Sequence, residues 1–211
     1  MSVVGLIAAG GTGERLGGPG PKAFVVLAGR PMLEWSLDVL REVCDRVMVA
    51  VPEGHEDGID RLVGGRSRSA SVRNALRAAP EATAVVVHDA ARPLVTADLV
   101  RQCLDCLPGA DGAVAAAPVT DTIKEAGPDR IVRATLERAS LWAIQTPQAF
   151  QPHVLRRALD TTEAELAAAT DDSTLVERDG GVIRLVEAPP ENLKVTSAFD
   201  FEIAERLLDA R

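Results

Sequence analysis

The feature that most constrains the fold lies at the start of the chain, where an apolar run leads into glycines. Val3–Ala8 is continuous, rich in β-branched residues and uncharged, and Gly10 and Gly11 follow it after a single alanine. Such a run is typical of a strand buried on both faces in a parallel sheet. Glycines directly after it let the backbone approach a ligand closely. The start of the chain therefore predicts an α/β fold with a binding loop at a strand end.

Strand-like and helix-like segments alternate along the rest of the chain. Further strands are expected at Arg46–Val51, Ala84–Val87, Gly112–Pro118 and Val182–Val186, and helices at Pro31–Val43, Ser69–Ala79, Thr96–Leu107, Pro152–Leu159, Asp172–Asp179 and Ala198–Ala210. This alternation predicts a Rossmann-like three-layer α/β fold, with helices on both faces of a mostly parallel sheet. The length of 211 residues, without a repeat or linker, suits a single domain over 1–211.

One segment, Val119–Leu141, breaks the alternation. It mixes charged residues with short alternating stretches such as Ile131–Arg133, and it has no apolar stripe at helical spacing. We therefore expect residues 119–141 to leave the core as an extended β-arm.

The overall charge and the cysteines exclude several classes of protein. A formal net charge of −8 argues against a general nucleic-acid or membrane surface, so an anionic ligand would need a local cluster of cations. No apolar run is long enough to span a bilayer, and the N-terminus lacks a signal-peptide pattern, so we expect a cytoplasmic protein. Cys103 and Cys106 form a C-x-x-C within an expected helix. Because no second pair completes a zinc site, they are interpreted as structural.

The loop Ala8–Lys22 points to phosphate binding. Its glycines can aim backbone N–H groups at phosphate oxygens, while Arg15 and Lys22 add cationic donors. The loop is not a dinucleotide fingerprint, because Leu16 stands where the third glycine is required. It is not a Walker loop either, since Pro21 precedes the lysine. Taken alone, the loop leaves a glycine-rich turn with solvated charges as an alternative.

More distant motifs narrow the interpretation. They are Ala9–Leu16 with Pro21-Lys22, Gly64–Ser71, Val87–Pro93, Pro118–Lys124, Leu141-Trp142 with Gln145–Gln148, Thr170–Asp172 and Asn192–Thr196. In this order they resemble the 2-C-methyl-D-erythritol 4-phosphate cytidylyltransferase family, within the sugar-nucleotide pyrophosphorylase-like nucleotidyltransferases. The resemblance extends from Leu6 to Leu208.

The resemblance implies a reaction in which an acceptor phosphate attacks the α-phosphorus of CTP and pyrophosphate leaves, in non-mevalonate isoprenoid biosynthesis. It implies catalytic roles for Arg15 and Lys22 at the α-phosphorus, and for Lys194 and Arg138 around the attacking phosphate. Because a phosphomonoester is largely dianionic at pH 7, this chemistry needs positioning and charge neutralisation rather than a general base.

The resemblance also assigns the binding residues. Those expected to hold CTP are Ala9, Gly10, Gly11, Gly13, Gly65 and Ser71, with Asp89 as the Mg²⁺ position; those expected to hold the acceptor are Arg92, Thr122, Thr146 and Thr170. In the family, the arm hooks around a second subunit, so the resemblance implies a homodimer in which arm residues complete the partner's site.

Several alternatives stay open at this point. The acceptor could be another polyol phosphate such as ribitol 5-phosphate, the base could be uracil or guanine, or the protein could be a non-catalytic relative. Asp89 could serve only as a helix cap. His88 is interpreted as closing a strand end, whereas Arg66 and Arg68 could be solvated and have no assigned role.

Overall fold

The computed structural model describes residues 2–11, 20–58 and 60–211. Its centre is a seven-stranded sheet in the order β11-β7-β10-β6-β1-β4-β5. The strands are β1 (Val3–Ala8), β4 (Arg46–Val51), β5 (Arg61–Val63), β6 (Ala84–Asp89), β7 (Gly112–Pro118), β10 (Trp142–Phe150) and β11 (Ile183–Glu187). All neighbouring pairs are parallel except those made by β10, so the expected mostly parallel sheet is confirmed.

β10 was not expected from the sequence. It lies between β6 and β7 and runs antiparallel to both. Its register with β7 shifts between Ile144 and Gln148, and the peptide bond between Thr146 and Pro147 in this stretch is cis. A proline cannot donate to the ladder and normally argues against a central strand, which is why the sequence pattern concealed this one.

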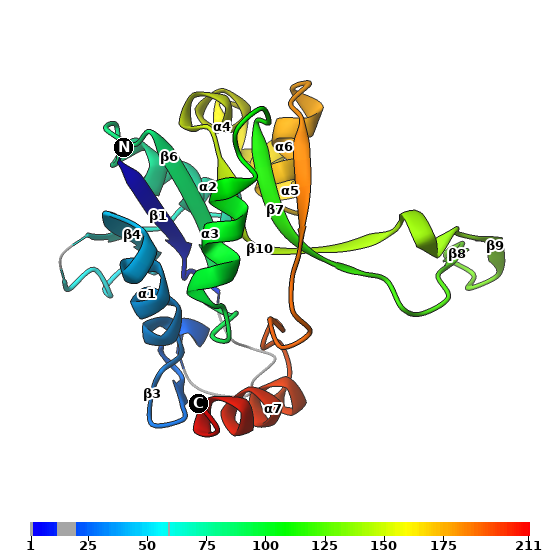
Figure 1. Ribbon diagram of the computed structural model, residues 1–211, viewed down its shortest axis with the longest axis horizontal. Helices are drawn as coiled ribbons and strands as arrows, with labels where there is room; N and C mark the ends of the chain where they lie inside the picture. The colour runs from blue at the N-terminus through cyan, green and yellow to red at the C-terminus, as the bar shows by residue number, and fades with distance from the viewer. Residues whose placement is uncertain (1, 12–19, 59) are drawn as a thin grey trace.

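Helices cover both faces of the sheet, as Figure 1 shows. They are α1 (Met32–Val43), α2 (Arg68–Arg77), α3 (Ala97–Asp105), α4 (Pro152–Leu159), α5 (Glu163–Ala168) and α6 (Asp172–Arg178). The last helix, α7 (Ala198–Asp209), lies apart from the sheet in a third apolar cluster. The alternation of side chains along each strand divides the core: Ile7 packs with α1 and α3, whereas Leu6 packs with α2, α4 and α6. The single three-layer domain is thereby confirmed.

The expected helix Thr96–Leu107 is present as α3, with a capping residue at its start and a buried cysteine within it. The Thr96 hydroxyl accepts a hydrogen bond from the Leu99 N–H, so Thr96 caps α3 as expected. Cys103 on this helix is buried, and burial raises the pKa of its thiol to about 12. This burial agrees with a structural role for Cys103, whereas Cys106 is only partly buried; all three cysteines are free.

Residues 119–141 leave the sheet between β7 and β10 and project far from the domain (Figure 1). At its tip, β8 (Lys124–Ala126) and β9 (Val132–Thr135) form a two-stranded antiparallel hairpin, followed by the short 3-10 turn η3 (Arg138–Ser140). Apolar side chains on it are exposed to solvent, including 66% of Ile131 and 55% of Val132. The segment is therefore an extended β-arm, as expected.

The C-terminal helix α7 closes a third, smaller apolar cluster. Leu208 and Ala204 pack there with Leu27 of the short hairpin formed by β2 (Val26–Leu27) and β3 (Arg30–Pro31). The turn η2 (Lys22–Phe24) leads into this hairpin. Among the helices of the described residues, none has the length and apolar character needed to cross a membrane.

Candidate active site

A pocket of about 540 Å³ opens where β1 and β6 end. In the strand order, β1 lies between β4 and β6. The chain runs from β1 to its neighbour β4 and later returns to β6 on the opposite edge of β1, so the direction of strand addition reverses at β1. Parallel α/β sheets bind ligands in the crevice at such a reversal. The residues that line it are Ala8, Ala9, Gly10, Gly11, Lys22, Ala23, Gly65, Arg66, Ser67, Arg68, Ser71, Asp89, Ala90, Ala91, Lys194 and Thr196. Many of the expected site residues are thus brought together from distant parts of the chain.

The glycine loop enters and leaves this pocket at fixed points. Ala9 donates its N–H to the Ala50 carbonyl, and the Lys22 N–H donates to the Gly11 carbonyl at 3.0 Å. The second bond brings the end of the loop back beside its beginning, so Lys22 lies on the pocket wall. Arg15 and Gly13 lie outside the described residues, so their expected roles stay predictions.

The expected base-binding corner is formed by the turn before α2. Ser71 accepts the Gly65 N–H at 2.9 Å and donates to the Ser67 carbonyl at 2.9 Å. A Cβ on Gly65 would stand 2.4 Å from the Cβ of Ala70, so only glycine fits at this position. The corner therefore presents backbone groups held by a buried hydroxyl, which suits recognition of a base edge.

Asp89 stands at the C-terminal end of β6 between two cations. Its Oδ1 accepts from Arg68 Nε at 2.7 Å, and its Oδ2 accepts from Lys194 Nζ at 2.7 Å. Burial by itself would raise the pKa of this carboxyl, but the charges and hydrogen bonds of Arg68 and Lys194 hold it well below its usual range. Asp89 is therefore an anion poised on the pocket wall.

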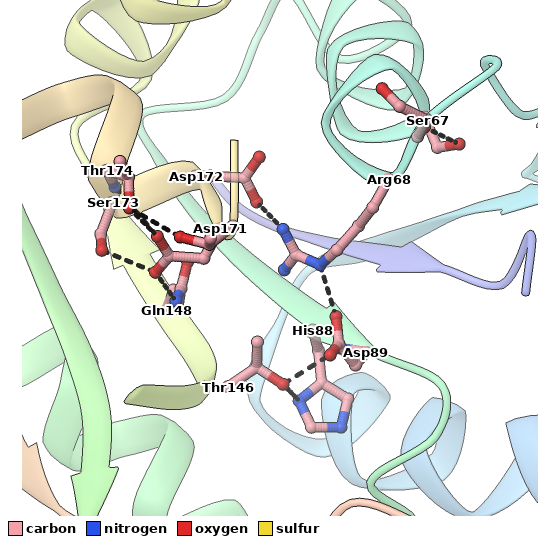
Figure 2. A network of polar contacts seen from close by, with 12 residues as sticks. Ser67, Arg68, His88, Asp89, Thr146, Gln148, Asp171, Asp172, Ser173 and Thr174 are labelled. Carbon is pink, nitrogen blue, oxygen red and sulfur yellow. Dashed lines mark hydrogen bonds and ion pairs between the residues drawn. The ribbon is translucent and has the colours of Figure 1, made fainter. Parts of the chain in front are cut away.

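Arg68, which the sequence left without a role, is not a solvated residue. Figure 2 shows its guanidinium lying between Asp89 and Asp172, with Nη1 2.5 Å from Asp172 Oδ2. Asp172 itself is fully buried. Burial alone would lower the pKa of Arg68, but the two carboxylates raise it, so the side chain is charged. Pairing with partners distant in sequence supplied what a local pattern could not reveal.

His88 holds the backbone of Asp89 from behind. It is completely buried, and burial lowers its pKa to about 4, so its ring is neutral near pH 7. Nε2 lies 3.2 Å from the Arg92 carbonyl and must donate to it, which leaves Nδ1 to accept from the Thr146 hydroxyl at 3.1 Å. That hydroxyl in turn accepts the Asp89 N–H at 3.1 Å. Thr146, which was expected to bind the acceptor substrate, therefore lies behind Asp89 here (Figure 2).

Arg92 is also buried behind the pocket. Its Nη1 donates to the Asn192 carbonyl at 2.8 Å, and Asn192 Nδ2 bonds the Thr146 carbonyl at 3.0 Å. Next along the chain, the Val195 N–H donates to the Ala91 carbonyl at 2.8 Å. These bonds fasten the segment that carries Lys194 to the end of β6, which explains how a residue so late in the chain reaches Asp89.

Three further expected residues lie away from the pocket within one chain. Thr122 and Arg138 lie exposed on the arm, where Arg138 Nη1 donates to the Thr120 carbonyl at 2.5 Å. Thr170 is exposed just before α6, with its hydroxyl 3.2 Å from that of Thr174. A substrate role for the arm residues would require the arm of another chain.

Sequence reasoning missed the pair Arg68 and Asp172. One signal was available, because a cation in the first turn of a helix opposes the helix dipole unless an acidic group compensates for it. Arg68 opens α2, whose expected start at Ser69 was one residue late.

The arrangement can bind a polyanion and neutralise charge. Glycine backbone, the N-terminal end of α2 and the lysines Lys22 and Lys194 face one pocket, and the carboxylate of Asp89 lines it as well. Positioning and charge neutralisation are the requirements of phosphoryl and nucleotidyl transfer.

Comparisons with known proteins agree with this geometry. Residues 3–210 match the model of the family described as 2-C-methyl-D-erythritol 4-phosphate cytidylyltransferase. Proteins of that name from Rubrobacter xylanophilus and Symbiobacterium thermophilum are 44% and 41% identical; the alignments cover 99% and 97% of this chain and 95% and 92% of the relatives.

A crystal structure of 2-C-methyl-D-erythritol 4-phosphate cytidylyltransferase from Thermus thermophilus superimposes with a TM-score of 0.84. It is 36% identical in sequence, and the match covers 99% of this chain and all of the other. Fold, pocket and sequence therefore agree over nearly the full length. The chain belongs to the 2-C-methyl-D-erythritol 4-phosphate cytidylyltransferase family.

Proposed function

We propose that this protein transfers the cytidylyl group of CTP to 2-C-methyl-D-erythritol 4-phosphate, releasing pyrophosphate, as a step of non-mevalonate isoprenoid precursor synthesis. Membership of a family of cytidylyltransferases supports this activity. The structural observation that carries it is the convergence of Lys22, Asp89 and Lys194 on one pocket beside a glycine backbone.

In the proposed reaction, a phosphate oxygen of the acceptor forms a bond to the α-phosphorus of CTP. The bond from the α-phosphorus to the bridging oxygen breaks, and pyrophosphate leaves with the electron pair. Arg15 and Lys22 would neutralise the charge that shifts onto the leaving group, while Lys194 would hold the attacking phosphate. The acceptor phosphate is already an anion near pH 7, so no residue needs to remove a proton.

A divalent cation fits the donor set of the pocket. Among the described residues, no group of three or more His, Cys, Asp or Glu side chains could hold a metal by itself. Mg²⁺ characteristically binds through one or two carboxylates together with substrate phosphates. Asp89 is the pocket carboxylate that would hold it, and the cation would supply charge neutralisation at the triphosphate. Bound there, it would share a carboxylate that Arg68 and Lys194 also contact.

We also propose that the protein is a cytoplasmic homodimer in which each arm completes the partner's pocket. Ile131, Val132 and Leu136 are three exposed apolar side chains within six residues of the arm, and this grouping supports an interface because a partner would cover them. Arg138 and Thr122 would reach the acceptor from the partner's arm. The free cysteines accord with a reducing compartment.

Pyrophosphate release from CTP, acceptor and Mg²⁺ tests the proposal directly. We expect 2-C-methyl-D-erythritol 4-phosphate to be preferred to ribitol 5-phosphate, and CTP to UTP, ATP and GTP. Equal or better turnover of ribitol 5-phosphate would overturn the choice of acceptor, and preference for another triphosphate would overturn the choice of nucleotide.

A further inference from the structure

Arg68 makes two carboxylate contacts at once. Nε bonds Asp89 at the pocket wall, and Nη1 bonds Asp172, whose side chain is fully buried. The three residues come from α2, β6 and α6 (Figure 2); α2 and β6 follow one another in the chain, whereas Asp172 of α6 lies 104 residues after Arg68. Arg68 therefore links two segments that reach the pocket independently.

Asp172, the buried partner of Arg68, belongs to a helix whose start is held by hydrogen bonds. Asp171 caps α6 by accepting from the Thr174 N–H at 3.0 Å, and its other oxygen accepts from Gln148 Nε2 at 2.7 Å. Gln148 belongs to the central strand β10 and is buried. The start of α6, and with it Asp172, is therefore fixed to the middle of the sheet.

We propose that Arg68 is a positioning residue. Because Asp172 holds its guanidinium in place, Arg68 sets the orientation of the Asp89 carboxylate toward bound CTP. The inference rests on the proposed function, since it assumes that Asp89 acts on CTP. A guanidinium presents several N–H groups in a planar fork, so one side chain can hold two carboxylates in a defined geometry. A lysine ammonium retains the charge but lacks that fork.

The competing interpretations are direct contact and simple structural support. Arg68 lines the pocket, and its buried Nη2 has no hydrogen-bond partner among the described residues, so it could instead bind CTP itself. It also compensates two buried carboxylates, so its removal could merely weaken the fold. A double-mutant cycle with Asp89 separates these roles from positioning.

The cycle compares Arg68→Lys in the native protein and in the Asp89→Asn background. A misplaced catalytic carboxylate can cost about a hundredfold in turnover, so we expect Arg68→Lys to lower kcat by about that factor. In the Asp89→Asn background, the same change should alter kcat by less than about threefold, because its target has already been lost. An equal loss in both backgrounds would overturn the proposal.

Asp172→Asn approaches the same contact from the side opposite the pocket. It is nearly isosteric and leaves Arg68 in place, so we expect a smaller loss, about tenfold, that is likewise absent in the Asp89→Asn background. Arg77→Ala is the matched control, because it removes a cation from the exposed last turn of the same helix. Thermal unfolding of each variant identifies any that has merely lost stability.

Failure of the proposed function would give a different result. If native protein released no pyrophosphate with the expected acceptor, that function would fail, and the cycle would be read from CTP affinity by calorimetry. Positioning predicts that Arg68→Lys and Asp172→Asn weaken CTP binding only while Asp89 is present. Unchanged affinity in both variants, with native CTP binding intact, would overturn the inference without touching the family assignment.

Discussion

The pocket and the arm use their charged and apolar residues in opposite ways. At the pocket, Asp89 and Asp172 are buried and joined by Arg68, so each charge has a partner within the chain. On the arm, Ile131 and Val132 are exposed, and the hairpin contacts little besides itself. The described wall of the pocket is therefore held by contacts within its own chain, whereas in the proposed dimer the arm would be covered by another molecule.

The largest expected effect is the loss of a pocket lysine. Lys22→Ala or Lys194→Ala should lower kcat by about 100- to 1000-fold, because each removes a cation that would stabilise the charge developing in the transition state. Arg101→Ala, which removes a half-exposed cation paired with Glu42 on the surface, serves as the control. Native-like activity of both lysine variants, measured by pyrophosphate release, would refute the mechanism.

The second prediction tests whether the arm acts on a partner. Lys194→Ala and Arg138→Ala chains should each be nearly inactive alone. When they are unfolded and refolded together, each mixed dimer would combine one intact body with one intact arm. Activity should then return to about one working site per mixed dimer. If each arm served its own chain, no mixture would regain activity.

The third prediction compares the stability of the two regions. Phe150 is fully buried at the end of β10, so Phe150→Ala should reduce the free energy of unfolding by about 3–5 kcal/mol. Ile131→Ser on the arm should change the unfolding of an isolated chain by less than about 0.5 kcal/mol. Urea titrations at concentrations that hold the protein monomeric would check both values, and a large loss for Ile131→Ser would mean that the arm packs within its own chain.

The smallest expected effect concerns the cap of α7 beside the pocket. Asp200 accepts hydrogen bonds from the Thr196 hydroxyl and backbone, and these bonds, led by the hydroxyl, outweigh its slight burial and lower its pKa to about 2. Asp200→Ala should cost about 1 kcal/mol at neutral pH, as for other caps.

That cost should depend on pH with a definite sign. Because the folded pKa is lower than the ordinary value, the stabilisation is complete above about pH 4 and disappears as the pH falls toward 2. Urea unfolding of native and Asp200→Ala proteins across this range should therefore converge at acid pH. A difference that stayed constant would show that the carboxylate charge makes no contribution.

The sequence predicted the parts that depend on local pattern. Apolar runs such as Gly112–Pro118 and the start of α4 at Pro152 were placed correctly because periodicity and capping act over a few residues. β10 escaped prediction because Thr146 and Pro147 conceal a strand that only its two neighbours stabilise. Arg68 escaped it because its partner Asp172 is 104 residues away. Long-range pairing of charges leaves no periodic trace in a sequence.

The way in which the arm joins the sheet makes it a separable module. Pro118 on β7 lies opposite Trp142 on β10, so the chain leaves and returns at directly paired positions. Antiparallel neighbours can be joined by a two-residue hairpin turn. Residues 119–141 could thus be replaced by a short Asn-Gly link without redirecting either strand. Such a shortened chain would offer a starting scaffold for grafting other arms, and hence other acceptor specificities, onto an unchanged nucleotide pocket.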